Sequence, residues 1–133
     1  MKNIIHVSGK RKKAIARATL KPGKGIIRVN KQNIEVYTPA LARAKIMEPL
    51  QLAGDVAKKV NIDVNVYGGG WQAQSEAARL SIAKSLVEFT KSTELKKKFI
   101  EYDRHLLIAD VRRNEPHKPN DSKPRAKRQK SYR

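Results

Sequence analysis

Apolar residues alternate with polar ones most regularly between positions 60 and 67. Valine or isoleucine occupies every second position there, and polar or aromatic residues stand between them. Positions 14–20 repeat the pattern, with alanine or leucine at the even positions. A period of two places alternate side chains on opposite faces of a strand, so both segments are expected to be strands with one buried face. Shorter apolar runs at 4–7 and 26–29 are expected to form further strands.

A turn signal connects two of these segments. The sequence Lys-Pro-Gly-Lys at 21–24 has proline and then glycine at its central positions, which is typical of a type II turn. We therefore expect residues 14–20 and 26–29 to pair as a hairpin. Gly9 is expected to act as a flexible hinge that leads into a basic loop at 10–13.

Helical signals predominate in the rest of the body. The Thr38-Pro39 pair is expected to start a helix, with the threonine as N-cap and the proline at the first helical position. Pro49 is expected to end this helix, because proline cannot donate the next backbone hydrogen bond. Residues 50–59 are expected to add one or two further turns. The apolar stripe within 72–90 predicts the longest helix of the chain.

A last helix is expected to begin at Ser92 or Thr93, since both residue types are good N-caps. Its predicted apolar face consists of Leu95, Phe99 and Tyr102. The three consecutive lysines after Leu95 are expected on the opposite face, where they are solvated or contact RNA. The apolar run 106–109 is expected to be a short buried strand or an extended segment.

The chain changes character after residue 109. Between 112 and 133 the only apolar residues besides proline are Ala126 and Tyr132, and six of the last eleven residues are lysine or arginine. Ordering each residue costs about 1–2 kcal/mol, which so little apolar burial cannot offset. We therefore expect a globular domain at 1–109 and an extended basic tail at 110–133, which becomes ordered against a polyanion.

The net charge of +18 is concentrated at the two ends of the chain. Residues 1–34 contain ten lysines and arginines and no acid, and residues 110–133 contain nine against three acids. The middle, 35–109, is nearly balanced at eleven against nine. A balanced body with two basic ends indicates a negatively charged partner, foremost a nucleic acid.

Basic residues near the N-terminus and in the tail are the candidate RNA contacts. Lysines at sheet edges also prevent strand-to-strand aggregation, but that role does not explain the complete absence of acids before residue 35. The candidates in the body are Lys10, Arg11, Lys12, Lys13, Arg17, Lys21, Lys24 and Arg28, and those in the tail are Arg112, Arg113, Lys118, Lys123, Arg125, Lys127 and Arg128.

Three consecutive glycines separate the most regular strand from the longest helix. A glycine loop before a helix can bind a nucleotide phosphate. The spacing fits neither the dinucleotide fingerprint nor the P-loop, because Trp71-Gln72 stands where a P-loop carries lysine and serine or threonine. A tight bend or a close approach to an RNA backbone is favoured, with Gly69, Gly70 and Gln72 as candidate contacts. Trp71 can stack on a base or pack in the protein.

Nothing in the sequence indicates catalysis. The three histidines, at 6, 105 and 117, lack metal-ligand spacing, no nucleophile motif surrounds the serines, and there is no cysteine. No apolar run approaches the roughly 20 residues of a membrane helix, and the apolar patch near residue 4 is too short for a signal peptide. We expect a cytoplasmic protein with no enzymatic activity, metal, cofactor, small-molecule substrate or membrane partner. The alternatives to an RNA-binding protein are a DNA-compacting chromatin protein and, more distantly, a ribonuclease.

Four stretches, in order along nearly the whole chain, resemble one known family. They are GKRKKAIARATLKPGKGIIRVN, YGGGWQAQSEAARLSIAKSL, DVRRNE and KPRAKRQKSYR. The family is the universal small-subunit ribosomal protein nine, and the short N-terminus and the final Lys-Ser-Tyr-Arg resemble its archaeal members. The resemblance implies an α/β (α+β) fold similar to the second domain of ribosomal protein S-five. That fold has a four-stranded mixed sheet, helices packed on one face and a left-handed βαβ crossover.

The resemblance also implies the partners. They are the ribosomal RNA of the small-subunit head, neighbouring head proteins, and the transfer RNA in the peptidyl site, whose anticodon stem-loop the tip of the tail would reach. Carried onto this sequence, Arg133 would contact a transfer-RNA phosphate and Lys130 would assist. Tyr132 stands where bacterial members carry a lysine, so it would stack on RNA or donate a hydroxyl hydrogen bond instead.

Overall fold

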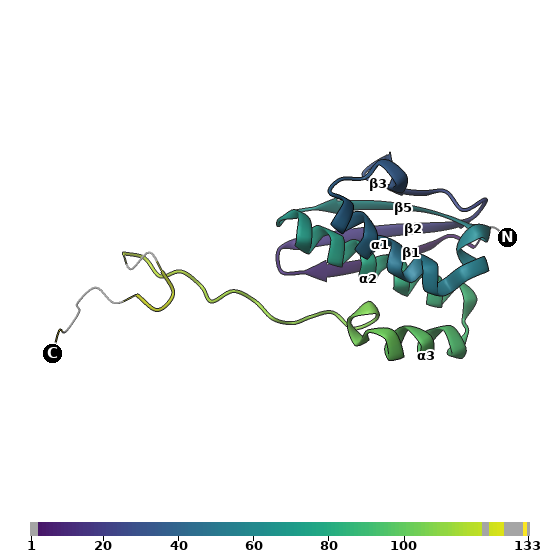
Figure 1. Cartoon of the computed structure of the whole chain (residues 1–133). Helices are drawn as coiled ribbons and strands as arrows, with labels where there is room; N and C mark the ends of the chain where they lie inside the picture. The colour runs from purple at the N-terminus through teal and green to yellow at the C-terminus, as the bar shows by residue number, and fades with distance from the viewer. Residues whose placement is uncertain (1–2, 121–122, 127–131, 133) are drawn as a thin grey trace.

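The two alternating segments pair with each other in one mixed β-sheet (Figure 1). The computed structural model describes residues 3–120, 123–126 and 132. Its strands are β1 (Ile5–Arg11), β2 (Ala14–Pro22), β3 (Ile27–Val29), β4 (Gln32–Asn33) and β5 (Val60–Tyr67). The strand order is β1-β2-β5-β3-β4, with β3 and β5 parallel and the other neighbours antiparallel. The mixed α/β architecture is confirmed, with a fifth strand because the two-residue β4 extends one edge.

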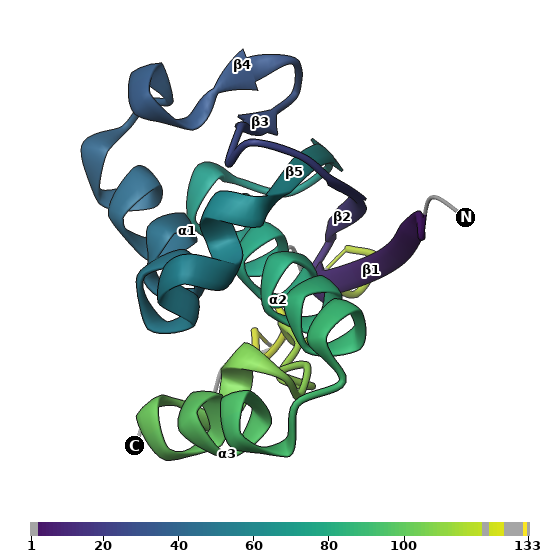
Figure 2. The same ribbon diagram turned by 90° about the vertical axis from the view of Figure 1, so that its right-hand side faces the viewer.

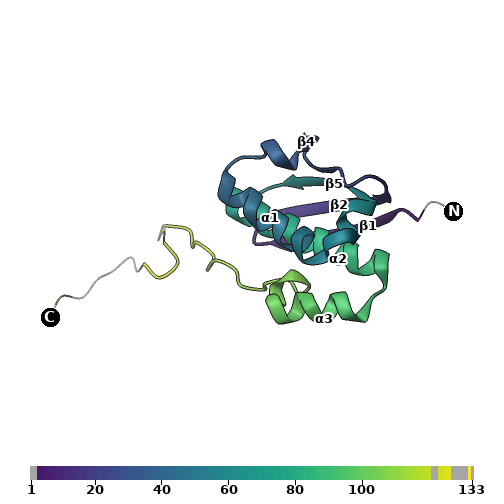
Figure 3. The ribbon, with the colours of Figure 1, turned by 45° about the vertical axis from the view of Figure 1, so that its right-hand side comes forward.

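The helices lie on one side of this sheet (Figure 2). They are α1 (Ala40–Ala53), α2 (Trp71–Thr90) and α3 (Thr93–Tyr102), with 3-10 turns at Ile34–Val36, Gly54–Lys59 and Arg104–Leu106. α2 packs directly on β1, β2 and β5, and α1 packs beside α2. α3 lies beyond α2, away from the sheet (Figure 3). The other face of the sheet is not covered by any described helix.

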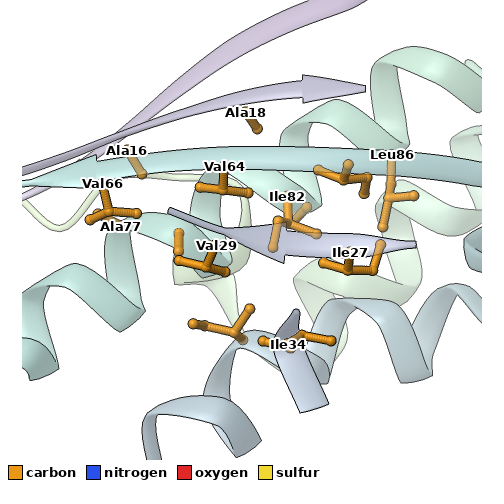
Figure 4. Packing of buried hydrophobic residues seen from close by; sticks show 14 of the residues in the cluster. Ala16, Ala18, Ile27, Val29, Ile34, Val64, Val66, Ala77, Ile82 and Leu86 are labelled. Carbon is orange, nitrogen blue, oxygen red and sulfur yellow. The ribbon is translucent and has the colours of Figure 1, made fainter. Parts of the chain in front are cut away.

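The apolar positions of the alternating strands form the core. The even-numbered residues from 14 to 20 on β2 and all even-numbered residues of β5 are buried, as the period of two predicts. Figure 4 shows Ala16, Ala18, Val64 and Val66 on these strands together with Ile82 and Leu86 of α2. Alanines on β2 allow α2 to approach the sheet closely, and the larger side chains fill the space to either side. Each large aliphatic side chain buried here contributes about 1.5–3 kcal/mol of transfer free energy.

The expected hairpin between residues 14–20 and 26–29 is wrong, because β5 lies between β2 and β3. The chain crosses the start of β5 instead of turning back on β2. The amides of Gly23 and Gly25 donate to the carbonyls of Lys59 and Val60, at 2.9 and 3.0 Å. The side chain of Asn61 accepts from the amides of Lys24 and Ile26, which fixes the crossing segment on β5. Hairpins instead join β1 to β2 and β3 to β4.

The first helix also differs from expectation. It begins at Ala40 with Pro39 as N-cap, and no side chain caps it, so Thr38 is not the cap. Pro49 lies inside the helix, which continues to Ala53. Pro49 and Ile46 are fully buried, so tertiary packing of this face outweighs the lost backbone hydrogen bond at the proline.

The prediction for the last helix is confirmed in part. The side chain of Ser92 accepts a hydrogen bond from the Leu95 amide, and Leu95 and Phe99 are buried. Tyr102 is 55% exposed, so its place on the apolar face is wrong. The segment 106–109 is not a strand, because it begins at the end of a 3-10 turn and only Leu106 is buried.

The chain beyond Leu106 has no helix or strand among its described residues. Figure 1 shows it leaving the body on the side where β1 and β2 are joined, opposite the N-terminus. The division into a domain at 1–109 and a tail at 110–133 stays a prediction. Of the helices in the described part of the chain, none combines the length and the apolar character that crossing a bilayer requires.

Gly9 is not a hinge in a loop but a buried residue within β1, and it generates a stability prediction. A Cβ at this position would lie 2.5 Å from the Ala77 carbonyl oxygen and 2.9 Å from the Ser81 nitrogen of α2. We expect Gly9→Ala to push β1 off α2 and to lower the free energy of unfolding by about 1–3 kcal/mol, measured by urea denaturation. Ser8→Ala, at the exposed neighbouring position, is the control and should change it by less than about 0.5 kcal/mol. Equal effects of both variants would contradict the close approach.

Candidate nucleic-acid interface

The uncovered face of the sheet gathers several candidate RNA contacts. Arg17 on β2 lies opposite Asn65 on β5, and Arg28 on β3 lies opposite Asp63. The Arg17 guanidinium lies over the ring of Tyr67, with its central carbon 5.5 Å from the ring centroid. Tyr67 is 48% exposed. This face therefore presents cations and an aromatic ring on a rigid support, an arrangement suited to phosphates and unstacked bases.

A second group of candidates meets at the end of the sheet where β1 turns into β2. Lys12 and Lys13 form this turn, and the glycine loop after β5 lies beside it. A Cβ on Gly68 would lie 2.5 Å from the Lys13 carbonyl oxygen, so only glycine permits this contact. A half-open cavity of about 320 Å³ lies here, lined by Lys12, Lys13, Gly69, Gly70, Arg113 and Asn114. We call it the junction cavity, because it lies between the body and the start of the tail.

The remaining body candidates lie apart from the junction cavity. Lys21 lies at the opposite end of β2, in register with Asn61 near the start of β5, and Lys24 follows the end of β2. Gln72 is exposed on the first turn of α2, and it does not line the cavity. The glutamine that supports the glycine loop is Gln74, whose side-chain amide donates to the Gly68 carbonyl at 3.1 Å. Trp71 is 42% exposed at the start of α2.

Arg11 has partners within the protein. Its Nε donates to Glu76 Oε2 at 2.7 Å, its Nη1 donates to the Arg112 carbonyl at 3.2 Å, and its Nη2 lies 3.5 Å from Asp110 Oδ2. The Arg11 side chain is only 12% exposed. Together with Lys45, which lies 3.4 Å from Glu76, these residues connect β1, α1 and α2 to the start of the tail. We call Arg11, Lys45, Glu76, Asp110 and Arg112 the anchor cluster.

A neighbouring ion-pair group holds the helices together. Arg79 on α2 lies 2.6 Å from Glu48 of α1 and 3.0 Å from Asp103, which follows α3. The Arg79 side chain is 12% exposed and its two acidic partners are 29% and 35% exposed, so the pairs are partly shielded from water. Burial alone raises the pKa of Asp103, but hydrogen bonds from the His105 amide and from Arg79 outweigh it, so the pKa is lowered.

Asp110 is held in its charged form at the start of the tail. The side chain of Arg112 donates to both of its carboxylate oxygens, at 2.7–3.1 Å, and the Arg112 amide donates as well. These hydrogen bonds lower the pKa of Asp110 well below its usual range. Because the pKa values of Asp103 and Asp110 are lower in the folded chain, their stabilisation is complete above the unfolded pKa of about 3.9. It is lost as the pH falls toward the folded values.

The candidate contacts of the tail are mostly exposed. Lys118 and Lys123 are exposed, and Arg125 pairs with Glu115 at 2.6 Å in a position open to solvent. This pair lowers the pKa of Glu115 and raises that of Arg125. Tyr132 is 88% exposed. The candidates Lys127, Arg128, Lys130 and Arg133 lie outside the described residues.

Sequence reasoning missed the acids that pair with these cations. Glu76 pairs with Arg11, and Arg79 pairs with Glu48 and Asp103. The only sequence feature that points to them is their i, i+3 spacing, which places both side chains on one face of α2. Their partners come from distant segments, which the sequence does not bring together. Among the described residues no group of three or more histidines, cysteines and acids could hold a metal ion.

Comparison with known proteins assigns the family. The family model described as "Ribosomal protein S9/S16" matches residues 9–133. Two proteins named "Small ribosomal subunit protein uS9", from the C7 and C5 strains of Methanococcus maripaludis, are each 52% identical to this chain over 132 residues. The matches cover 98% of this chain and 98% of each relative. The match includes both basic ends as well as the folded body, and the chain therefore belongs to the ribosomal protein S9/S16 family.

Proposed function

We propose that this chain is built into the head of the small ribosomal subunit, where its body binds ribosomal RNA and its tail extends to the peptidyl-site transfer RNA. Family membership makes it a structural constituent of the ribosome rather than an enzyme. The observation that carries the finer proposal is the distribution of charge. Among the described residues, cations without an acidic partner lie on the open sheet face, at the β1–β2 turn and in part of the tail, while Glu48 of α1 and Glu76 of α2 pair with cations inside the body.

The body contacts RNA through its open sheet face and its β1–β2 turn. Arg17, Arg28 and Lys10 are exposed on strands whose positions are fixed by the sheet. Cations on a rigid support lose little conformational freedom when they meet phosphates. Tyr67, with Arg17 over its ring, offers a surface for an unpaired base.

The tail binds RNA through its positive charges, and its length allows its tip to contact the transfer RNA. Its lysines and arginines replace counterions along folded RNA, and about six such contacts would contribute roughly −4 to −5 to the log–log salt slope. The terminal Arg133 carries a planar fork that can hold a phosphate with two hydrogen bonds, and Lys130 and Tyr132 lie beside it in sequence. Contact with phosphates alone suits a protein that meets every transfer RNA, because it requires no particular sequence.

The anchor cluster gives the tail its starting point. Arg11 holds the Asp110 side chain and the Arg112 carbonyl while it pairs with Glu76 of α2. The tail therefore leaves the body from a fixed position rather than from a free end. We propose that Arg11 acts on RNA binding by positioning the tail, because little of its side chain is exposed for direct contact.

The partner is tested by sucrose-gradient sedimentation of a cell lysate, with every fraction probed for this chain. We expect it in the fractions of small subunits and complete ribosomes. Sedimentation with DNA would favour the chromatin alternative, and recovery only at the top of the gradient would overturn the proposal. Purified chain incubated with labelled RNA should leave the RNA intact, which excludes the ribonuclease alternative.

The tip of the tail is tested by deleting residues 130–133. We expect assembled small subunits that carry this deletion to bind peptidyl-site transfer RNA about 3- to 10-fold more weakly, because charge-assisted contacts to phosphate are lost. Lys96→Gln combined with Lys97→Gln removes two charges from the exposed face of α3 and is the matched control. An unchanged affinity in the deletion variant would contradict the role of the tip.

The anchor is tested by Arg11→Met, which keeps an apolar stem and removes the guanidinium. We expect the loss of the 2.7 Å hydrogen bond to Glu76 to lower the free energy of unfolding by about 1–3 kcal/mol in urea denaturation. Amides at 111–113 should also exchange faster with solvent. The control is Lys58→Met, whose ion pair with Asp55 is exposed and should contribute less than about 0.5 kcal/mol. If both variants behave alike, Arg11 does not anchor the tail.

A further inference from the structure

The junction cavity combines segments that are far apart in the sequence. Lys12 and Lys13 come from the β1–β2 turn, Gly69 and Gly70 from the loop before α2, and Arg113 from the start of the tail. Its volume of about 320 Å³ exceeds the roughly 30 Å³ that one water molecule occupies in the liquid. The cavity can therefore hold a small polar group together with its hydration.

The charges around this cavity are unbalanced. Its lining contains the three cations Lys12, Lys13 and Arg113 and no acid. None of the three has a carboxylate partner among the described residues. The adjacent cavity, of about 120 Å³, differs in this respect, because its lining includes Glu76, Asp103 and Asp110. One cavity is neutralised from within the protein, and the other lacks its counter-charge.

The walls of the junction cavity are held in place by the backbone. The space beside Gly68 is closed by the Lys13 carbonyl, and a Cβ on Gly69 would lie 3.2 Å from the Ala14 nitrogen. A Cβ on Gly70, in contrast, would meet nothing within 4 Å. Arg113 is also partly fixed, since its Nη1 donates to the carbonyls of Asp110 and Arg112, at 3.3 and 3.1 Å. Its other N–H groups remain available to an anion.

We propose that the junction cavity binds one phosphate group of the RNA backbone, held by the β1–β2 turn and by the start of the tail at the same time. The inference deepens the proposed function and rests on it for the choice of RNA as the source of the phosphate. A phosphate shared between Lys13 and Arg113 connects the β1–β2 turn to the tail one residue beyond Arg112, whose carbonyl accepts a hydrogen bond from Arg11. Docking of the body on RNA then sets the direction in which the tail continues.

The site is tested by titrating the full chain with inorganic phosphate at constant ionic strength, with chloride as the reference salt. We expect saturable changes in the nuclear magnetic resonance shifts of the Gly69 and Gly70 amides. Arg113→Ala and Lys13→Ala should each weaken phosphate binding about 5- to 10-fold, since each removes one charge-assisted contact. Lys97→Ala, an exposed lysine on α3, removes the same charge elsewhere and should leave binding unchanged.

Further titrations with RNA and ATP identify the source of the phosphate. A conservative variant and the unfolding midpoints show whether weaker binding results from loss of folding. A short RNA duplex should shift the same amides and compete with inorganic phosphate, whereas ATP should bind no more tightly than inorganic phosphate. Arg113→Lys keeps a charge on an exposed residue and should restore part of the affinity. The thermal unfolding midpoint of each variant should match that of the parent chain.

The proposal is overturned if the cavity amides do not saturate or if Arg113→Ala binds phosphate as tightly as the parent chain. Tighter binding of ATP than of RNA would also overturn it, because the site would then serve a free nucleotide. These outcomes are distinct from failure of the proposed function, which is decided by sedimentation with ribosomal subunits.

Discussion

The pairing of β2 with β5 is the constraint on which the rest of the structure depends. The register places Ile15 opposite Tyr67 and Pro22 opposite Val60, so the end of β5 lies beside the start of β2. This register turns the even-numbered residues of both strands toward α2 and leaves the odd-numbered residues on the open face. It also brings the glycine loop against Lys13. Core, open face and junction cavity therefore follow from one alignment of two strands. A slip of one residue would exchange the buried and exposed faces of one strand and would shift the glycine loop relative to Lys13.

The same strand geometry decides which cations form ion pairs within the protein and which remain exposed. The run from Lys10 to Lys13 is uniformly basic in sequence, but strand alternation separates its members. Arg11 turns toward α2 and meets Glu76, while Lys10 is exposed and the two lysines of the turn line the junction cavity. A salt bridge with an exposed fraction of 12% on the arginine is less screened than a surface pair, so it can fix the tail where exposed pairs cannot.

The elements that the sequence predicted correctly are those that depend on residues close together along the chain. The alternation from Val60 to Val66, the helix 72–90 and the Ser92 cap all depend on near neighbours, and the structure confirms them. The predicted hairpin is wrong because Pro22-Gly23 indicates that the chain changes direction but not which strand pairs with β2. Pro49 failed as a helix end because its cost is outweighed by burial against a helix more than twenty residues later in the chain. Both errors concern contacts between distant segments, which periodicity does not encode.

The candidate site shows the same limit for charge. Composition identified a basic N-terminal segment and a basic tail, but it could not distinguish Arg11 from Lys12, because their roles differ only through Glu76 and Asp110. The distinction matters for the energetics of RNA binding. Ordering each tail residue costs about 1–2 kcal/mol. The residues next to Asp110 are already ordered by the anchor cluster, so binding does not have to order them again. In the proposed complex, RNA contacts made by Arg112 and Arg113 would therefore add to affinity almost in full, because the anchor cluster already fixes this segment.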